Sequence, residues 1–431
     1  MKTLGRIKKM IRQNTPKWII GFYHWFLVFS GAVFYRFPSR KITVIGVTGT
    51  SGKSTVVELV SEILRSTGHR VASSSSIQFR IGEDIQRNEL KMTMPGRWTL
   101  QKFLFNAVKE KCEYAVLEVT SEGISQHRHR FINFDTLVFT NLSPEHIERH
   151  GGFENYRAIK GSLFAGLSKS MKKLKTTIIN LDDEQADYFL SFEADRKIGF
   201  GMEKHKLPGV YLEEMVLSPT GSSFGFNGQK VQWSLLGEFN ILNGLAAVAT
   251  VSAHGIKLQE AAKILDSINI MPGRMELVIK TPFVVVVDYA HTPKSLKGVY
   301  KTVKEGLKGR MILVLGACGG GRDRWKRPVF GKLASEYGDI IILTNEDPYD
   351  ENPTSIIEQV DAGISKEFSG KRFLILDRSE AIKKALNLAQ PGDAIVITGK
   401  GSESVICQAN NEKIPWDDRE RVRYFWSEIN S

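Results

Sequence analysis

The apolar positions of the chain form two successive series of short runs, and most of these runs are rich in β-branched residues. Between residues 41 and 270, segments with helical spacing lie between several of the runs. Such alternation predicts a mostly parallel β-sheet with helices on both faces. The runs of this first series are KITVIGVT, RVASSSS, YAVLEVT, TLVFTNL and TTIINLD.

Residues 198–236 predict short antiparallel strands that form an appendage, and LLGEFNILNGLAAVATVSAHG predicts a turn followed by a helix. The Pro-Gly pair in MPGRMELV marks a domain junction. A second alternating series follows and indicates a second open α/β domain. Its expected strands are FVVVVDYA, MILVLGA, DIIILTN, RFLILD and DAIVITG.

Residues 42–64, ITVIGVTGTSGKSTVVELVSEIL, have the pattern of a strand, a glycine loop and a helix. In this arrangement backbone N–H groups and a helix N-terminus surround an anion. Lys53 is placed to contact the β- and γ-phosphates of a nucleotide, and the hydroxyl of Ser54 or Thr55 is placed to ligate Mg²⁺. The match to the common phosphate-loop pattern is imperfect, because the first glycine of that pattern falls at Val47. The loop itself consists of Gly49, Thr50, Ser51 and Gly52.

These patterns predict an α/β protein with three parts. Residues 41–271 form a central ATP-binding domain of the phosphate-loop type with a mostly parallel sheet, and residues 272–431 form a Rossmann-like α/β domain. Residues 1–40 form a basic and apolar helical segment that precedes both domains.

Within that segment, residues 1–17 hold six Lys/Arg and no acid, and Trp18 to Tyr35 carries no charge. An uncharged stretch of this length meets the lower limit for a membrane span. A span would keep the basic flank inside and place the following domain outside, where ATP is scarce. A secretory signal is disfavoured, since no small-residue cleavage site is evident. We expect a helix that lies in the membrane interface or packs on the next domain, and the sequence leaves these two open.

Candidate metal ligands follow the next two predicted strands. Glu118 ends YAVLE, where α/β sheets place ligand-binding groups. The segment after TLVFTNL contributes titratable side chains, and a carboxylate, an imidazole and the Ser54 hydroxyl suit one or two Mg²⁺ ions. Lys160 stands among apolar residues on a helix, so its ammonium either reaches solvent or is buried at a cost. The titratable side chains of the segment are Glu145, His146, Glu148 and His150.

Composition narrows the function classes. A content of 42% hydrophobic and 25% charged residues is that of a globular enzyme. Cys112, Cys318 and Cys407 lie far apart, which indicates reduced thiols in a cytoplasmic protein. The net charge of +12 is spread along the chain without a nucleic-acid-binding motif, so we expect no nucleic-acid partner. Attraction to an anionic substrate or to an anionic membrane surface explains the excess of positive charge. We expect the protein to be a monomer.

Eight motifs resemble those of the Mur ligases, in that family's order, over residues 41–431. The likeness is greatest to the ligases that add the third amino acid to UDP-N-acetylmuramoyl-dipeptide. The resemblance implies that ATP converts a peptide carboxylate into an acyl phosphate and that an amino-acid amine displaces the phosphate. The motifs are GVTGTSGKST, LEVTSEGI, FTNLSPEHIERHG with NYRAIK, LLGEFNILN, PGRMELV, VVDYAHTPKSL, GACGGGRDRWKRP and GKGSE.

The resemblance also implies roles for single residues. It makes Glu118 and His146 ligands of Mg²⁺, of which two ions are expected. It makes Lys160 a carbamylated lysine, which replaces a buried ammonium by an anion beside the second ion. Basic groups beside the reacting phosphoryl suit a transition state whose negative charge grows. The remaining implied positions are Asn240 beside the adenine, Arg274, Asp288 and His291 closing the nucleotide site, and Arg322, Asp323, Lys326 and Arg327 near the reacting phosphoryl and the amino acid.

The chain departs from the family at both substrates. The family's N-terminal domain, which binds the UDP part of the acceptor, is replaced by the segment at residues 1–40. That replacement suits a lipid-linked peptidoglycan precursor at the bilayer surface. Where the family reads Asp-Asn-Pro-Arg for meso-diaminopimelate, this chain reads Glu346-Asp347-Pro348-Tyr349. The lost arginine favours an amino acid that ends in an amine, such as lysine or ornithine.

In GKGSE, Ser402 stands where the family has histidine, whereas Gly399 and Glu403 keep the spacing that holds the polar end of the amino acid. Ligases of the same fold that act on another carboxylate, of the folylpolyglutamate or cyanophycin type, remain alternatives, although EHIERHG and DYAHTP count against them. A non-catalytic, membrane-associated nucleotide-binding scaffold is a further alternative, against which the retained Glu118 and Lys160 count. A regulatory GTPase or motor is disfavoured, because the chain has no Asn-Lys-x-Asp motif.

Overall fold

The computed structural model describes residues 17–88, 92–145, 147–218, 221–269 and 271–430. Among these residues, eleven strands form one sheet in the order β11-β10-β9-β8-β7-β6-β1-β5-β2-β3-β4. Strand β1 lies inside this sheet and pairs in parallel with both β5 and β6. The strands are β1 (Thr43–Thr48), β2 (Val71–Ser74), β3 (Gln78–Ile81), β4 (Asp84–Arg87), β5 (Tyr114–Glu118), β6 (Thr136–Phe139), β7 (Thr176–Asn180), β8 (Arg196–Gly201), β9 (Gly209–Ser218), β10 (Gly221–Phe226) and β11 (Gln229–Trp233).

A second sheet of the described residues has six strands in the order β12-β13-β17-β14-β15-β16. Its first strand is antiparallel to β13, and the other pairs are parallel. The strands are β12 (Glu276–Ile279), β13 (Val284–Asp288), β14 (Met311–Leu315), β15 (Ile340–Leu343), β16 (Lys371–Leu374) and β17 (Ala394–Thr398), with a separate hairpin of β18 (Val405–Cys407) and β19 (Lys413–Pro415).

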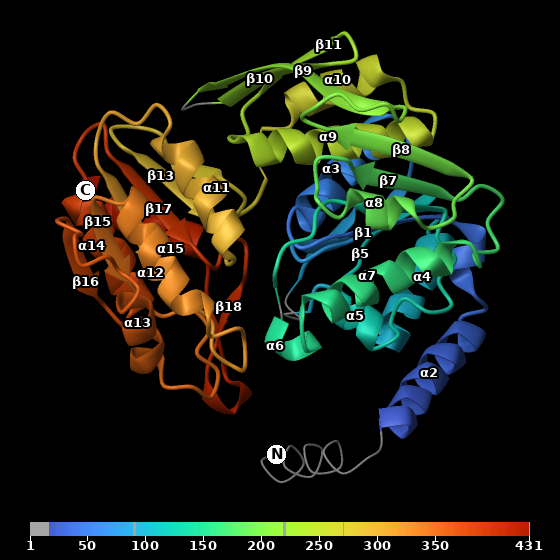
Figure 1. The fold of residues 1–431 in the computed structure, drawn as a ribbon, viewed down its shortest axis with the longest axis horizontal. Helices are drawn as coiled ribbons and strands as arrows, with labels where there is room; N and C mark the ends of the chain where they lie inside the picture. Colours follow the sequence, from blue (N-terminus) through green and yellow to red (C-terminus); the bar gives the residue numbers. More distant parts are fainter. Residues whose placement is uncertain (1–16, 89–91, 146, 219–220, 270, 431) are drawn as a thin grey trace.

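Helices cover both faces of each sheet (Figure 1), so the predicted α/β fold class is confirmed. On the first sheet, α3 (Lys53–Ser66), α9 (Glu238–Ala253) and α10 (Leu258–Ser267) share one core, and α4 (Arg97–Lys109), α5 (Ser121–Ser125), α7 (Phe153–Leu167) and α8 (Ala186–Leu190) share the other. On the second, α11 (Pro293–Lys304), α12 (Lys326–Tyr337) and α13 (Pro353–Asp361) oppose α14 (Arg378–Leu388) and α15 (Asp418–Asn430). The short helices are η1 (Pro38–Lys41), α6 (Ile147–His150) and η2 (Ala409–Asn411).

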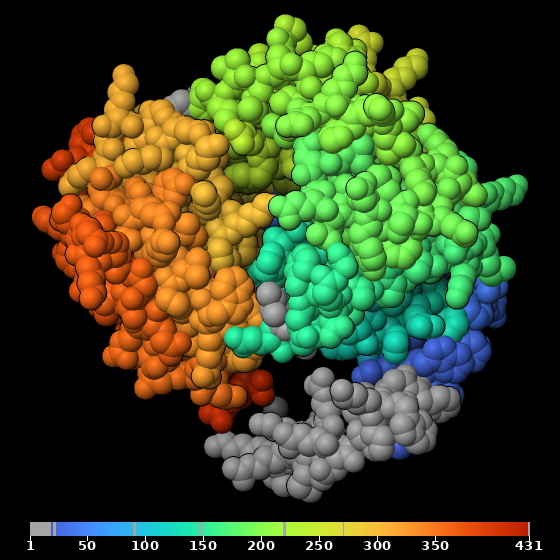
Figure 2. Space-filling view, in the orientation of Figure 1, coloured from blue at the N-terminus to red at the C-terminus, as the bar shows by residue number. Residues whose placement is uncertain are grey.

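The two sheets lie on either side of the division predicted at residues 271 and 272. Figure 2 shows the C-terminal domain, in orange and red, packed along one side of the central domain in green. The carboxyl ends of β1 and β5 carry the phosphate loop and Glu118, as expected for ligand-binding groups in a parallel sheet.

The segment predicted as an antiparallel appendage, residues 198–236, is instead continuous with the large sheet. Strand β8 pairs in parallel with both β7 and β9, and within this segment only β10 is antiparallel to its neighbours, β9 and β11. The short spacing between β8 and β9 does not reveal this parallel pairing, because nearby strands in a chain usually form hairpins.

The N-terminal segment contains helix α2 (Lys17–Phe34), and residues 1–16 lie outside the described part. No helix among the described residues is long and apolar enough to cross a membrane. The carboxyl end of α2 packs on α4, where Gly31 lies against Trp98 and the rings of Phe34 and Trp98 are 5.3 Å apart. The predicted packing on the next domain is therefore present for part of the helix.

Candidate active site

The loop between β1 and α3 has the geometry of an anion-binding loop. Gly49 and Gly52 have positive φ angles of 156° and 79°. A Cβ at Gly49 would lie 1.9 Å from Oγ1 of Thr140, and a Cβ at Gly52 would lie 2.3 Å from Oδ1 of Asn243. Both positions therefore require glycine for space as well as for conformation. Among the described residues no side chain caps α3, so its first N–H groups face the loop and can receive a phosphate.

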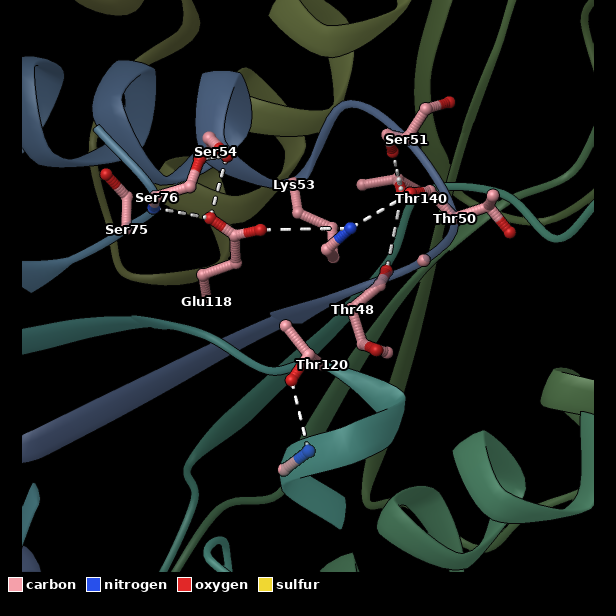
Figure 3. A network of polar contacts seen from close by, with 12 residues as sticks. Thr48, Thr50, Ser51, Lys53, Ser54, Ser75, Ser76, Glu118, Thr120 and Thr140 are labelled. Carbon is pink, nitrogen blue, oxygen red and sulfur yellow. Dashed lines mark hydrogen bonds and ion pairs between the residues drawn. The ribbon is translucent and has the colours of Figure 1, made fainter. Parts of the chain in front are cut away.

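Polar side chains next to this loop form one network (Figure 3). Nζ of Lys53 donates to the carbonyl oxygen of Thr50 at 2.9 Å and lies 3.7 Å from Oε1 of Glu118. Oγ of Ser54 donates to Oε2 of Glu118 at 2.7 Å, and the backbone N–H of Ser76 donates to the same oxygen at 2.9 Å. A buried carboxylate, a hydroxyl and an ammonium thus meet where the phosphates of a nucleotide would lie.

A cavity of about 950 Å³ lies between the two domains and includes this network. Its volume is at the upper end of the range for small-molecule sites. The cavity brings together most of the predicted site residues from both halves of the chain. Those that line it are Gly49, Thr50, Ser51, Gly52, Lys53, Ser54, Thr55, Glu118, Lys160, Asn240, Arg274, Asp288, His291, Arg322, Tyr349 and Glu403.

Lys160 lies on α7, is 1% exposed and borders this cavity. Its Nζ donates to the carbonyl oxygen of Gly49 at 2.8 Å and to Oγ1 of Thr48 at 3.3 Å. Burial, reinforced by the charge of Lys53, holds the pKa of Lys160 well below its ordinary value. The side chain therefore does not reach solvent, and its burial beside the phosphate loop favours the neutral amine.

Contacts on both sides of the cavity join the domains. Nζ of Lys326, on α12, pairs with Oε1 of Glu145 and lies 3.5 Å from Oδ2 of Asp323. Burial raises the pKa of Glu145, and the charge of Lys326 opposes that rise. On the other side of the site, Nη2 of Arg274 donates to Oγ of Ser76 at 3.2 Å. Residues predicted to close the nucleotide site and to face the phosphoryl group thus contact the central domain directly.

On the nucleotide side, Asn240 is buried and donates through Nδ2 to the carbonyl oxygen of Leu236 at 2.8 Å. Its Oδ1 has no hydrogen-bond partner among the described residues. An adenine amino group would supply the missing donor, so the site fits a purine base.

Asp288 shapes the junction between the domains. Its carboxylate accepts the backbone N–H groups of Met275 and Ala290 at 2.7 and 2.6 Å. Burial raises the pKa of Asp288 and lowers that of His291 to about 3, so the imidazole is neutral in this structure. The two residues line the cavity as predicted, and the Asp288 contacts hold the turn that carries Arg274.

At the end of the site predicted to bind the amino acid, the two acids of Glu346-Asp347-Pro348-Tyr349 do not line the large cavity. Oε1 of Glu346 accepts a hydrogen bond from Sγ of Cys318 at 2.8 Å. Oδ1 of Asp347 accepts from Nζ of the buried Lys400 at 2.8 Å. Tyr349 itself borders the cavity. The direct contacts available to an amino acid therefore come from Tyr349 and its neighbours rather than from the two acids.

Lys400 also holds the carboxylate of Glu403, the acidic residue of GKGSE, in place. Its Nζ donates to Oε2 of Glu403 at 2.7 Å, so one ammonium holds Asp347 and Glu403 together. Gly399 supports the same region, because a Cβ there would lie 2.4 Å from Oε2 of Glu346. Of these residues, Glu403 lines the large cavity, together with Arg322.

Several cavity residues were missed by the sequence reasoning. Ser76 donates its backbone N–H to Glu118, but it belongs to a run of serines that shows no motif. Asn243 lies against Gly52 of the phosphate loop, but it stands inside a helix that shows no motif either. Tyr289, whose ring centroid lies 4.4 Å from the Arg274 guanidinium carbon, stands inside the motif VVDYAHTPKSL next to the predicted Asp288, and that position could have singled it out.

Comparisons with known proteins decide the family. Models of the Mur ligase middle domain and of the Mur ligase glutamate ligase domain match residues 47–251 and 273–401. The chain is similar to the UDP-N-acetylmuramoyl-L-alanyl-D-glutamate--2,6-diaminopimelate ligase of Geobacillus kaustophilus, with 35% identity over 397 residues, 90% of this chain and 80% of that protein. The ligase of the same name from Syntrophomonas wolfei is 36% identical over 398 residues, 91% of this chain and 80% of that protein. This chain belongs to the Mur ligase family.

Solved structures agree with this assignment. A UDP-N-acetylmuramoyl-L-alanyl-D-glutamate--2,6-diaminopimelate ligase superposes on this Mur ligase with a TM-score of 0.62 and 31% identity, covering 90% of this chain and 79% of that one. The folylpolyglutamate synthase of Mycobacterium tuberculosis has a TM-score of 0.69 at 18% identity, covering 86% and 92%, and shares the fold. Mur ligases form peptide bonds with ATP and release ADP, and this Mur ligase is an enzyme of that class.

Mur ligases use ATP with Mg²⁺, and the site of this Mur ligase fits both in part. Glu118 and Ser54 offer oxygen atoms 2.7 Å apart beside the phosphate loop. His146 lies outside the described residues. In the part of the chain that the structure describes, no three His, Cys, Asp or Glu side chains form a metal-binding group. Phosphate oxygens of the nucleotide can contribute further ligands, as is usual for Mg²⁺.

Proposed function

We propose that this Mur ligase joins an amino acid to the free carboxylate of a muramoyl peptide through an acyl phosphate. An oxygen of the acceptor carboxylate attacks the γ-phosphorus of ATP, and the bond to ADP breaks. The amino-acid nitrogen then attacks the acyl carbon and displaces inorganic phosphate, which leaves an amide. The observation that carries this proposal is the single cavity onto which the phosphate loop, Glu118, Lys160 and Arg322 all open.

In this proposal the chain's own residues bind and orient the reactants. The glycine loop and Lys53 hold the terminal phosphates, and Asn240 lies on the adenine side. Arg274, Arg322 and Lys326 supply positive charge from the second domain, where negative charge grows in the transition state. Bound Mg²⁺ would shield the phosphate charge, with Glu118 and Ser54, and by expectation His146, as its ligands.

We further propose that Lys160 is carbamylated in the active enzyme. A carbamate forms only from the neutral amine, and burial beside Lys53 favours that form. Conversion to a carbamate adds an anion beside the phosphate loop, where Nζ of Lys160 now lies against Gly49 and Thr48. This anion would serve a second Mg²⁺ and would replace the contacts that Nζ makes with Gly49 and Thr48.

The proposed amino acid has a carboxylate at one end and an amine at the other, as lysine and ornithine do. The related ligases named above act on 2,6-diaminopimelate, which carries a second carboxylate. Here Arg322 lines the cavity and can pair with one carboxylate, whereas Tyr349 offers no charge for another. Glu403, held by Lys400, suits the distal ammonium.

The related ligases act on a UDP-linked dipeptide, and we propose a lipid-linked form of such an acceptor for this chain. In this proposal the segment at residues 1–40 brings the enzyme to the inner face of the membrane, where it works as a monomer. The apolar residues 18–35 and the basic residues 1–17 support it. A folylpolyglutamate- or cyanophycin-type acceptor is the alternative, with only the shared fold in its favour.

ADP release tests the reaction class. Release should require ATP, a muramoyl-peptide acceptor and an amino acid together, and the amide product should appear in equal amount. Lysine, ornithine and diaminopimelate should be compared with UDP-linked and lipid-linked acceptors. ADP release that does not depend on the acceptor, or that rises only with a folate or an arginine–aspartate polymer, would overturn the proposal.

A further inference from the structure

Helix α2 and helix α4 expose large apolar side chains on the flank of the central domain. We call this surface the aromatic face; it consists of the residues listed at the end of this paragraph. Phe34, Tyr23 and Phe26 are 67%, 57% and 53% exposed, which is unusual for residues of this size. Contiguous apolar patches mark interaction sites. The aromatic face comprises Tyr23, Trp25, Phe26, Phe29, Val33 and Phe34 of α2 and Trp98 and Phe105 of α4.

The two helices form one continuous surface rather than two separate patches. The ring of Phe34 lies 5.3 Å from Trp98, and the ring of Tyr35 lies 5.5 Å from Phe105. Further along α2, Trp25 and Phe29 stack at 5.2 Å. Figure 1 shows α2 and α4 on the side of the central domain that faces away from the C-terminal domain.

Positive charge accompanies this surface. Trp98, Lys102, Phe105 and Lys109 follow one another at helical spacing and are all exposed, so one side of α4 alternates aromatic and basic groups. Residues 1–41 contain nine Lys/Arg and no Asp or Glu. The exposed acid at the end of α4, Glu110, pairs with Arg70 at 3.4 Å.

Exposed aromatic side chains together with positive charge favour an anionic lipid bilayer over a second copy of the chain as the binding partner. A second copy would bring its own cations against those of the first, which costs free energy. An anionic bilayer accepts both features at once, because aromatic side chains insert at the headgroup level and Lys/Arg attract acidic lipids. We propose that the aromatic face docks on an anionic lipid bilayer, with α2 lying in the interface and α4 providing a second line of contact.

This docking would hold the enzyme at the surface where an acceptor on a lipid carrier resides. Helix α4 begins at Arg97, three positions after Met94, and both Thr93 and Met94 line the cavity between the domains. A short segment would then connect the docked flank with the cavity that receives the acceptor. That consequence rests on the proposed ligase function, whereas the docking itself does not.

Co-flotation of the full chain with vesicles, in the absence of substrates, tests the docking. The chain should float with phosphatidylglycerol vesicles at low salt, and much less with phosphatidylcholine vesicles or at high salt. The variant Trp98→Ser/Phe105→Ser should reduce binding at least tenfold, since each buried aromatic side chain contributes strongly at the interface. A second variant, Lys102→Gln/Lys109→Gln, leaves the packing on α2 intact and should reduce binding several-fold for each charge removed.

The matched control is Leu374→Ser/Leu376→Ser, which removes two exposed apolar side chains from the C-terminal domain and should bind as the wild type does. Wild-type protein that stays with the soluble fraction would overturn the proposal, as would α4 variants that float like the control. A dimer in solution that the α4 variants dissolve would show that the face binds a second copy instead. Activity with a UDP-linked acceptor, measured in parallel without vesicles, separates failure of docking from failure of the proposed ligase reaction.

Discussion

Lys326 of the C-terminal domain forms a buried ion pair with Glu145 of the central domain, although 181 positions separate them in the chain. Their side chains are 8% and 3% exposed. The sequence predicted a role in the reaction for both residues. Glu145 was a candidate ligand of Mg²⁺, and Lys326 was expected near the reacting phosphoryl group and the amino acid. The pair makes closure of the two domains depend on a buried charge contact next to the site.

Replacing Lys326 with methionine should therefore impair domain closure as well as charge stabilisation. The variant leaves the Glu145 carboxylate buried without its cation, which is costly. We expect kcat/KM to fall roughly 100-fold or more, and the radius of gyration with bound nucleotide to exceed that of the wild type. Small-angle scattering and steady-state kinetics check the two effects. The control Lys383→Met, which removes an exposed pair within the C-terminal domain, should change kcat/KM by less than about threefold.

A carbamate at Lys160 makes a specific prediction about chemical rescue. Lys160→Ala should lower kcat by roughly 1000-fold or more, because an anion that serves a metal ion is lost. Added formate or acetate should restore part of the rate by supplying an anion in the space that is left. Added short amines should have no such effect. Rescue by amines alone would show that the lysine acts as a cation, and the carbamate proposal would be wrong.

The lowered pKa of Lys160 also predicts how stability varies with pH. Between the lowered pKa of the folded lysine and the ordinary pKa of the unfolded one, only the unfolded lysine is fully protonated. The unfolded state therefore holds more protons, so this residue's contribution to the free energy of unfolding rises with pH until the ordinary value near ~10.4 is passed. Lys160→Met lacks this dependence. Without nucleotide, Mg²⁺ or CO₂, it should be more stable than the wild type at pH 7, with a gap that narrows towards pH 10.

Denaturant titrations at several pH values measure that gap. The comparison variant Lys332→Met changes an exposed lysine on the same kind of element and should leave a constant difference across the pH range. A gap for Lys160→Met that stays constant with pH would contradict a neutral buried amine.

The phosphate loop and the position of Glu118 at the end of a strand follow from local patterns, and these were predictable from the sequence, whereas the strand order around β1 was not predicted. The glycines at 49 and 52 are needed for positive φ, and Glu118 ends a strand that pairs directly with β1. The partners of Lys326 and Glu346 were not predictable, because their contacts depend on how the domains pack and on a thiol 28 residues away. Local sequence patterns depend on residues that are close in the chain, whereas these contacts depend on tertiary packing.

Glu118 should control the affinity for Mg²⁺. Glu118→Gln keeps the shape of the side chain but removes the charge that faces Lys53 and the hydroxyl of Ser54. Loss of a group that only orients a metal ligand commonly costs about 10- to 100-fold in metal affinity, and loss of a ligand itself should cost at least as much. The Mg²⁺ concentration for half-maximal activity should therefore rise by about 10-fold or more, while ATP should still bind at saturating Mg²⁺. The control is Glu62→Gln. Glu62 lies on the same helix as Ser54 but forms an ion pair only at the surface, with Arg65, so this variant should leave the Mg²⁺ dependence unchanged.

Tyr349 should decide between amino acids with one and with two carboxylates. Tyr349→Arg adds a cation at the edge of the cavity, where the distal carboxylate of diaminopimelate would lie. A charge-assisted hydrogen bond contributes about 1.5–3 kcal/mol, so the ratio of kcat/KM for diaminopimelate over lysine should rise roughly 10- to 100-fold. Tyr349→Phe removes the hydroxyl without adding charge and should leave the ratio within about threefold of the wild type. An equal ratio in Tyr349→Arg and Tyr349→Phe would place the specificity elsewhere, with Glu403 and Arg322 as the remaining charged groups at that end of the cavity.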